Sequence, residues 1–110
     1  MNDAAAPAYL MVQLKSKDRE ESMRRYGPFA LATVAQFGGE LLAGTPTPNV
    51  LEGGWDGNWA AILRFPSMAI AKAWYESPEY RPLKDLRINE LTESGRVVLL
   101  EGVGPASSTG

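Results

Sequence analysis

The fold is decided by residues 64–86, which read RFPSMAIAKAWYESPEYRPLKDL. This stretch predicts the end of a strand, a helix that begins at Ser67, a break, and a second helix that begins at Ser77 and runs to about Leu91. A serine oxygen at an N-cap accepts a hydrogen bond from the free amides of the first turn. Pro78 follows at the first helical position, where its missing amide costs nothing. The break brings four residues to one corner, which we interpret as a pocket rim: Tyr75, Glu76, Glu79 and Tyr80.

The rest of the chain alternates strand and helix patterns around this stretch. An amphipathic helix capped by Ser16 or Asp18 is expected to run to about Phe37, with a kink at Gly27-Pro28. Gly38-Gly39 should end it, because glycine adopts the left-handed conformation without penalty. Strands are predicted at residues 8–14, 40–44, 59–65 and 96–101, with a short edge segment at 50–55. The order β-α-β-β-α-β predicts an α+β, ferredoxin-like fold: an antiparallel sheet with two helices on one face.

At least three of the predicted strands are apolar on both faces. Residues 8–14 (AYLMVQL) and 59–65 (WAAILRF) each contain a single polar or charged side chain, a pattern typical of strands that are covered on both sides. Two helices can cover only one face of the sheet. We therefore expect a homodimer in which a second copy covers the other face, so that the two sheets form a dimeric α/β barrel.

Length and charge limit the function classes. The chain has 110 residues, enough for one domain, which we place at 1–110 with an ordered core at about 8–103 and flexible tails. The net charge is −2 and no basic block is present, so we expect no nucleic-acid partner. No apolar run reaches the roughly 20 residues of a membrane span, and the N-terminus lacks a signal-peptide pattern. We expect a cytoplasmic protein with no membrane partner.

The chain contains no cysteine and no histidine. Disulfides, thiol nucleophiles, histidine-based triads and the commonest soft metal ligands are therefore excluded. Acid–base chemistry would have to use Asp, Glu, Tyr, Lys or Arg side chains, or a bound cofactor. The carboxylates form no cluster at metal-binding spacing, and the Gly-Gly pairs are too short for a phosphate-binding loop. We expect neither a metal nor a cofactor.

Three separated motifs resemble a known family. They are Phe65-Pro66-Ser67-Met68 with Ala73-Trp74-Tyr75 and Ser77-Pro78-Glu79-Tyr80, the upstream Val50-Leu51-Glu52-Gly53 with Trp55, and Glu101-Gly102-Val103. Together they resemble domain-of-unknown-function family 1330, of the dimeric α/β-barrel superfamily, from about Tyr9 to Val103. The resemblance implies a ferredoxin-like fold and a dimer whose sheets form a barrel. It implies no particular reaction, because the superfamily includes monooxygenases, isomerases, dehydratases and haem-binding enzymes.

Three residues are candidate acid–base catalysts. Glu52 lies among apolar residues, where a carboxylate can acquire a raised pKa and serve as general acid or base; it also matches the family motif. An exposed or ion-paired glutamate is the alternative. Tyr26, beside the kink, and Tyr80, in the first turn of the restarted helix, could donate a proton or orient a substrate oxygen. The alternative is that each packs in the core with its hydroxyl near solvent.

Four residues are candidate substrate-binding groups. Trp55, flanked by glycines, and Trp74 could form the wall of a pocket for a planar ligand, although Trp74 also suits packing of helix on sheet. Arg64 and Arg87 could bind a carboxylate or phosphate with two parallel hydrogen bonds. The alternatives are a salt bridge for Arg64 and a solvated helix position for Arg87.

Two functions fit these residues. The first is a small cofactor-independent enzyme that uses carboxylate and tyrosine acid–base chemistry on a small apolar or aromatic carbonyl or carboxylate substrate, of isomerase, lyase, cyclase or monooxygenase type. The second is a non-catalytic homodimer that binds a small-molecule ligand or a protein partner. A pocket filled by the protein's own side chains would be a structural variant of the second.

Overall fold

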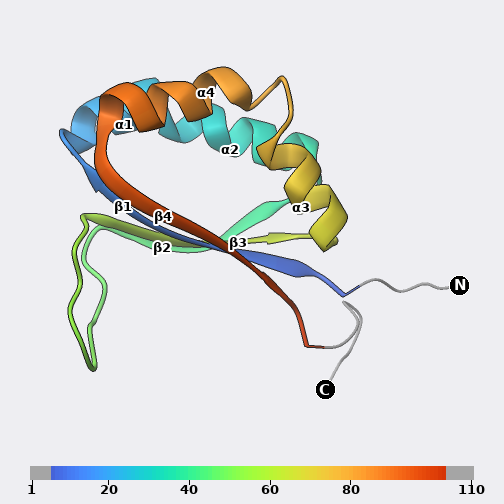
Figure 1. Ribbon diagram of the computed structural model, residues 1–110, viewed down its shortest axis with the longest axis horizontal. Helices are drawn as coiled ribbons and strands as arrows, with labels where there is room; N and C mark the ends of the chain where they lie inside the picture. The colour runs from blue at the N-terminus through green and yellow to red at the C-terminus, as the bar shows by residue number, and fades with distance from the viewer. Residues whose placement is uncertain (1–5, 104–110) are drawn as a thin grey trace, which may run out of the picture.

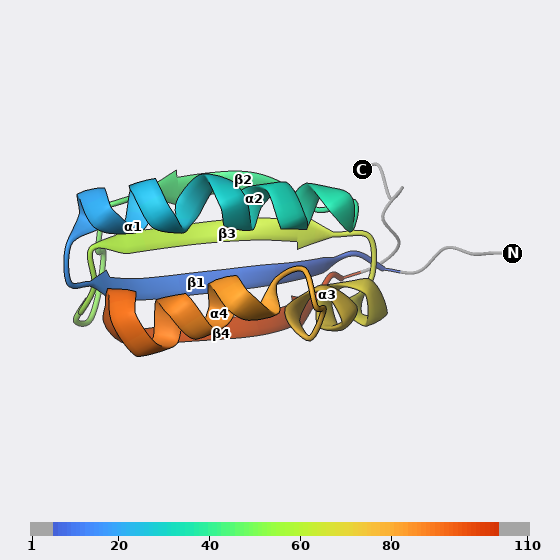
Figure 2. The ribbon, with the colours of Figure 1, turned by 90° about the horizontal axis from the view of Figure 1, so that it is seen from above.

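The computed structural model describes residues 6–103. One four-stranded antiparallel sheet, in the order β2-β3-β1-β4, carries all the helices on one of its faces (Figures 1 and 2). The central strand β1 pairs with β3, where Leu10 lies opposite Leu63, and with β4, where Leu10 lies opposite Leu99. The predicted α+β, ferredoxin-like arrangement is confirmed. The elements are β1 Ala8–Ser16, α1 Arg19–Arg25, α2 Gly27–Gln36, β2 Glu40–Thr45, β3 Trp59–Phe65, α3 Met68–Tyr75, α4 Arg81–Leu86, the π-helical turn η1 Arg87–Leu91, and β4 Thr92–Glu101.

The first helical segment breaks where the sequence predicts. Asp18 caps α1 by accepting from the Glu21 amide at 3.1 Å, and α1 stops at Arg25. Tyr26 separates the two helices, and Pro28 lies in the first turn of α2, where a missing amide is harmless. Gly38 ends α2 with a φ of 76°, and the Gly39 amide donates to the Val34 carbonyl at 2.9 Å. Both features satisfy free carbonyls at the helix end.

The second helical segment breaks after Tyr75, as predicted, but the helix restarts later than predicted. Ser67 caps α3 by accepting from the Ile70 amide at 3.2 Å. Ser77 accepts from the Tyr80 amide at 3.2 Å and donates to the Trp74 carbonyl at 2.7 Å. A turn over residues 78–80 follows, however, so α4 begins at Arg81 rather than at Pro78.

The core lies between the helices and the sheet. Its buried side chains come from alternate positions of β1 and β3 and from the inner faces of α2 and α3. Aromatic rings make up much of it, and Tyr80 and Phe65 are the largest side chains that are fully buried. The principal core residues are Ala8, Leu10, Val34, Ala61, Leu63, Phe65, Trp74 and Tyr80.

Three sequence-based predictions need correction. Residues 50–55 form part of a loop and not an edge segment; three glycines between 53 and 57 give this stretch little tendency to extend. Strand β4 begins at Thr92, four residues earlier than predicted, because β1 supplies pairing partners for its polar start. The flexible tails predicted outside about 8–103 lie largely outside the described residues, but the carbonyl of Pro7 accepts a hydrogen bond from the Gly102 amide at 2.6 Å. None of the helices within 6–103 is long and apolar enough to cross a membrane.

Candidate functional site

Two tyrosines from the two helix breaks meet beneath the helices. Tyr26 lies between α1 and α2, and Tyr80 lies at the N-terminus of α4. Their hydroxyls form a hydrogen bond, and their rings pack edge to face with centroids 6.3 Å apart. Tyr80 is only 2% exposed. Each break therefore turns a tyrosine inward, and the two hydroxyls share one point although they are 54 residues apart in sequence.

Trp74 forms the floor beneath this pair. Its indole is 3% exposed and stacks on the Tyr80 ring with centroids 4.2 Å apart. The indole N–H donates to the Thr33 hydroxyl at 2.9 Å, so the buried polar group is satisfied. Phe65 of β3 packs on the other side, at 5.2 Å between centroids. Trp74 thus links helix, sheet and site, and it holds Tyr80 in one orientation.

Arg87 places a buried cation beside the tyrosines. The residue is 5% exposed and begins η1, the π-helical turn that follows α4. Its Nη2 lies 3.5 Å from the Tyr75 hydroxyl, while its Nε has no hydrogen-bond partner within residues 6–103. The sequence-based alternative of a solvated helix position is therefore wrong. Burial of a guanidinium with an unused N–H donor costs free energy unless an anion balances its charge and accepts that hydrogen bond.

The pKa values of these groups are shifted by their surroundings. Burial, and then the neighbouring Tyr80, raises the pKa of Tyr26 far above its usual range. Burial alone would lower the pKa of Arg87, but the adjacent Tyr80 and Tyr26 outweigh burial and raise it. At neutral pH Tyr26 is therefore a neutral phenol that can donate a hydrogen bond. Arg87 remains a cation.

A cavity of about 360 Å³ opens beside this cluster. Of the cluster, Arg87 and Tyr75 line this cavity, whereas Tyr26 and Tyr80 lie behind them and do not. Glu93 is the one acidic residue of its lining; its side chain is 56% exposed and its Oε1 lies 3.8 Å from Nζ of Lys15. The full lining consists of Tyr75, Arg87, Ile88, Thr92, Glu93, Ser94, Gly95 and Val97. We call Tyr26, Tyr75, Tyr80 and Arg87, with this cavity, the tyrosine–arginine site.

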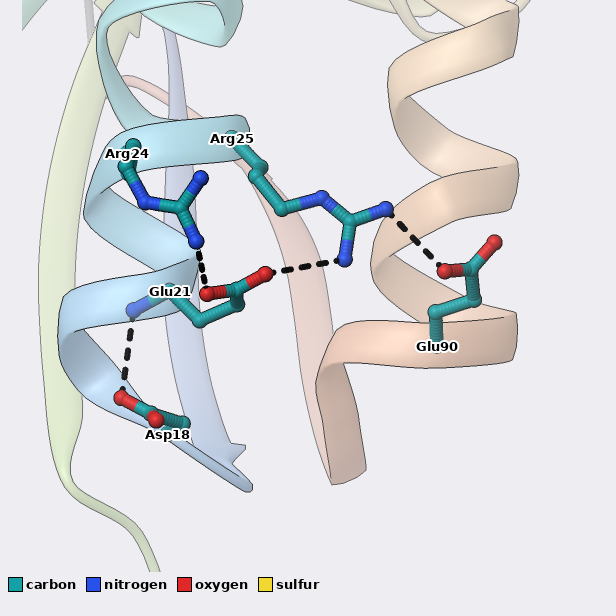
Figure 3. Close-up of polar contacts among 5 residues, drawn as sticks. All are labelled: Asp18, Glu21, Arg24, Arg25 and Glu90. Atoms are coloured by element: carbon teal, nitrogen blue, oxygen red, sulfur yellow. Dashed lines mark hydrogen bonds and ion pairs between the residues drawn. The ribbon is translucent and has the colours of Figure 1, made fainter.

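A polar network braces the helices that carry this site. Arg25 donates from Nη1 to Oε2 of Glu21 at 3.2 Å and from Nη2 to Oε1 of Glu90 at 3.1 Å (Figure 3). Glu21 also accepts from Arg24. Because Arg25 precedes Tyr26 and Glu90 lies in η1 with Arg87, these bonds tie the two sides of the site together. The groups are partly exposed, so solvent screens these ion pairs and each one contributes little to stability.

The structure brings together four of the seven predicted site residues. Tyr26, Tyr80, Trp74 and Arg87 form one cluster, and the other three lie elsewhere. Glu52 is exposed in the loop at 46–58 and lines neither this cavity nor the one on the sheet. Trp55 lies in the same loop and donates from its indole to the Gly57 carbonyl at 3.0 Å. Arg64 pairs with Glu40 across β3 and β2, which agrees with the salt-bridge alternative.

Of the cavity lining only Arg87 was a predicted site residue, and the two others with chemically useful side chains for the proposal are Tyr75 and Glu93. Tyr75 was assigned only to the pocket rim; its ring is covered by Lys84, whose Nζ lies 4.4 Å from the centroid. Glu93 belongs to a polar start of β4, and no local pattern distinguishes it from a solvated glutamate. Pairing of Ser94 with Lys15 of β1 brings Glu93 to the cavity, so only the sheet register could have identified it.

Alkaline pH should destabilise the protein through Tyr26. In the unfolded chain this phenol ionises near pH 10.0, whereas burial in the fold raises its pKa. Its contribution to stability is therefore complete below pH 10 and is lost progressively as the pH rises towards the folded-state value. We expect urea unfolding midpoints to fall between pH 9.5 and about 11, with a shallower fall in Tyr26→Phe. Equal slopes in the two proteins would contradict this assignment.

The comparisons with known proteins agree with this fold. A protein of unknown function from Rhodopseudomonas palustris is 21% identical with a TM-score of 0.72, covering 94% of this chain and 88% of that one. A dimeric ferredoxin-like protein of unknown function from Bacteroides fragilis is 21% identical with a TM-score of 0.57, covering 91% and 100%. A candidate antibiotic biosynthesis monooxygenase from Nitrosomonas europaea is 13% identical with a TM-score of 0.58, covering 96% and 97%.

No curated protein matches the chain. The domain of unknown function DUF1330, in contrast, matches residues 7–103. This match spans every strand and helix described above, from the first residue of β1 to the last residue of β4. The chain therefore belongs to the DUF1330 family.

Proposed function

We propose that this chain is a small cofactor-independent enzyme that acts on a small apolar or aromatic molecule carrying a carbonyl and a carboxylate. The observation that carries the proposal is the buried Arg87 guanidinium, whose Nε has no partner within residues 6–103 although it borders a cavity. A bound carboxylate would supply the missing charge and acceptor atoms. Tyr75, Ile88 and Val97 in the cavity lining beside the cation suit an apolar or aromatic substrate.

The tyrosines supply the acid side of the chemistry. With a raised pKa, Tyr26 donates a hydrogen bond and does not act as a base at neutral pH. A carbonyl that reached past the cavity lining and replaced the mutual hydrogen bond of Tyr26 and Tyr80 would gain electrophilic character, and the enolate formed by proton loss would be stabilised by the same donors. Glu93, at the cavity, is the carboxylate placed to accept that proton. In this proposal Tyr26 and Tyr80 keep their predicted roles, and Glu93 takes the role that was predicted for the carboxylate of Glu52.

This arrangement favours proton transfer next to a carbonyl, which is the common step of isomerase, lyase and cyclase reactions. Monooxygenase chemistry on an enolisable substrate belongs to the same class, because an enolate is the electron-rich form that reacts with oxygen. The fold similarity to the candidate monooxygenase of Nitrosomonas europaea supports keeping that type in the proposal.

A non-catalytic ligand-binding protein is the second candidate. The mutual hydrogen bond of Tyr26 and Tyr80 favours it, since each hydroxyl already has a partner without substrate. In either case we propose a homodimer. Large apolar side chains remain exposed on the sheet face opposite the helices, and burial of that face would stabilise the pair of chains.

Phenylpyruvate, which has an aromatic ring, a carbonyl and a carboxylate, tests the proposal. We expect the protein to accelerate exchange of its C3 protons for deuterium, followed by proton NMR in D₂O. The doubly substituted Tyr26→Phe, Tyr80→Phe protein should lose about 100-fold of this rate, as for loss of a general acid. Binding without exchange would select the non-catalytic alternative. Loss of exchange in Glu52→Gln, with the tyrosine variant unaffected, would place the reaction outside this site.

A further inference from the structure

We infer that the loop at residues 46–58 is an arm that clasps a second copy of this chain, with Leu51 buried against the partner. The inference rests on the proposed homodimer and deepens it, because it assigns the loop a part in the interface. Figure 1 shows this arm leaving the ends of β2 and β3 and extending on the side of the sheet opposite the helices. It therefore projects towards the space that a partner sheet would occupy.

The root of the arm is held in place. Asn58 makes two hydrogen bonds with the Ser16 backbone, donating from Nδ2 to the carbonyl at 2.9 Å and accepting at Oδ1 from the amide at 2.8 Å. Gln13 donates to the Asp56 carbonyl at 2.8 Å. The Asp56 carboxylate lies 3.3 Å from Nζ of Lys15. An arm fixed to β1 by these bonds presents its tip in one position, so it can meet a partner at little entropic cost.

The tip of the arm and the sheet face are both apolar. Leu51 is 93% exposed and Val50 is also exposed. The sheet face opposite the helices, which we call the open face, carries exposed Met11, Ile62, Val98 and Leu100. A hollow of about 420 Å³ lies where the arm meets this face, with Trp55 of the arm on its side. Isolated apolar side chains are common on protein surfaces. Here, however, the apolar open face and the apolar arm adjoin each other, and a continuous apolar patch of this kind is typical of an interaction surface.

The area of the open face explains why an arm is needed. Its four strands have six to ten residues each. At a spacing of about 4.8 Å and a rise of about 3.3 Å per residue, they cover about 400–600 Å². A stable interface buries about 800 Å² on each partner. Contact of the two open faces alone therefore gives an interface of limited extent, and an arm from each copy would enlarge it.

Charge complementarity identifies the partner as a second copy. Glu52 lies beside Leu51 at the tip of the arm, and Arg96 lies on the open face beside the hollow. Within residues 6–103 neither forms an ion pair. In a two-fold symmetric dimer every contact occurs twice: if residue i of the first copy contacts residue j of the second, then residue j of the first contacts residue i of the second. The acidic tip and the basic floor of the same chain therefore suit each other across a two-fold axis.

Sedimentation equilibrium of three variants and the wild type tests the inference. Leu51→Asp should weaken the dimer by about 10- to 100-fold, because a buried leucine is replaced by a charge. Phe29→Asp is the control, since Phe29 is also a large exposed apolar residue but lies on α2, away from the open face. It should leave the dimer unchanged. Ile62→Asp, in the centre of the open face, should give monomers.

The outcomes separate the arm from the dimer itself. If Ile62→Asp is monomeric while Leu51→Asp dimerises like the wild type, the arm is not part of the interface and the inference is overturned. If the wild type is monomeric at 100 µM but still catalyses the exchange of phenylpyruvate protons, the proposed homodimer and the proposed role of the arm are both overturned. The proposed enzymatic function is not affected by that result. In a second readout, the thiol of Leu51→Cys, alone in a chain without cysteine, should react more slowly as protein concentration rises. An unchanged rate would also overturn the inference.

Discussion

Replacement of Trp74 by alanine should lower the free energy of unfolding by about 3–5 kcal/mol, as for other fully buried aromatic side chains. The indole packs between Phe65 and Tyr80 at 5.2 and 4.2 Å. Its removal leaves a cavity and also leaves Thr33 without the indole donor. Neither helix nor sheet can close the gap without moving the other, so we expect little relaxation. Urea denaturation with an unchanged m-value would measure the loss.

Trp55→Ala is the matched control for this prediction. Trp55 is 36% exposed in the arm, and its indole bonds only to the nearby Gly57 carbonyl. Its loss should cost less than about 1 kcal/mol under conditions where the protein is monomeric. If Trp74→Ala cost no more than Trp55→Ala, the tryptophan would not be the packing centre that joins the helices to the sheet.

Replacement of Arg87 by methionine should leave the fold as stable as the wild type, or make it more stable by about 1–4 kcal/mol, while ligand binding is weakened. Methionine matches the length of the buried stem and removes a charge whose Nε has no partner within residues 6–103. Exchange of buried ions for apolar side chains is often neutral or stabilising. The lost charge-assisted hydrogen bonds to a carboxylate should weaken phenylpyruvate binding by about 10- to 100-fold.

Thermal unfolding and calorimetric titration, carried out on the same preparations, measure both effects. Arg24→Met is the control, because Arg24 is exposed and within residues 6–103 its side chain bonds only to Glu21; it should change neither the unfolding temperature nor the binding affinity appreciably. A destabilised Arg87→Met with unchanged binding would mean that the arginine serves the fold and not a ligand. Gain of stability with loss of binding is the pattern of a residue kept for function.

Much of the fold could be predicted because its signals are local. Caps at Asp18 and Ser67, the break at Gly27-Pro28 and the stop at Gly38 depend only on neighbouring residues, and the structure has all of them. Errors arose where longer-range contacts decide. Strand β4 extends over a polar start because β1 offers backbone partners. Residues 50–55 had a strand-like apolar start but no neighbouring strand to pair with.

The site was only partly predictable for the same reason. Tyr26 and Tyr80 could be selected because each lies beside a helix break. Their hydroxyl contact requires the packing of one helix pair against the other, over 54 residues of sequence. Arg87 has the spacing of an ordinary helix position, and its burial follows from the π-helical turn and from β4 beneath it.

The amino-acid sequence by itself therefore determined the order of strands and helices, the positions of the helix breaks, and the absence of thiol and imidazole chemistry. Those properties follow from residue type and near neighbours along the chain. Tertiary structure alone decided that three tyrosines surround a buried arginine, that Glu93 borders their cavity, and that Glu52 lies on an arm far from them in the chain's own fold. Such contacts depend on sheet register and on how helices pack, which no short stretch of sequence encodes.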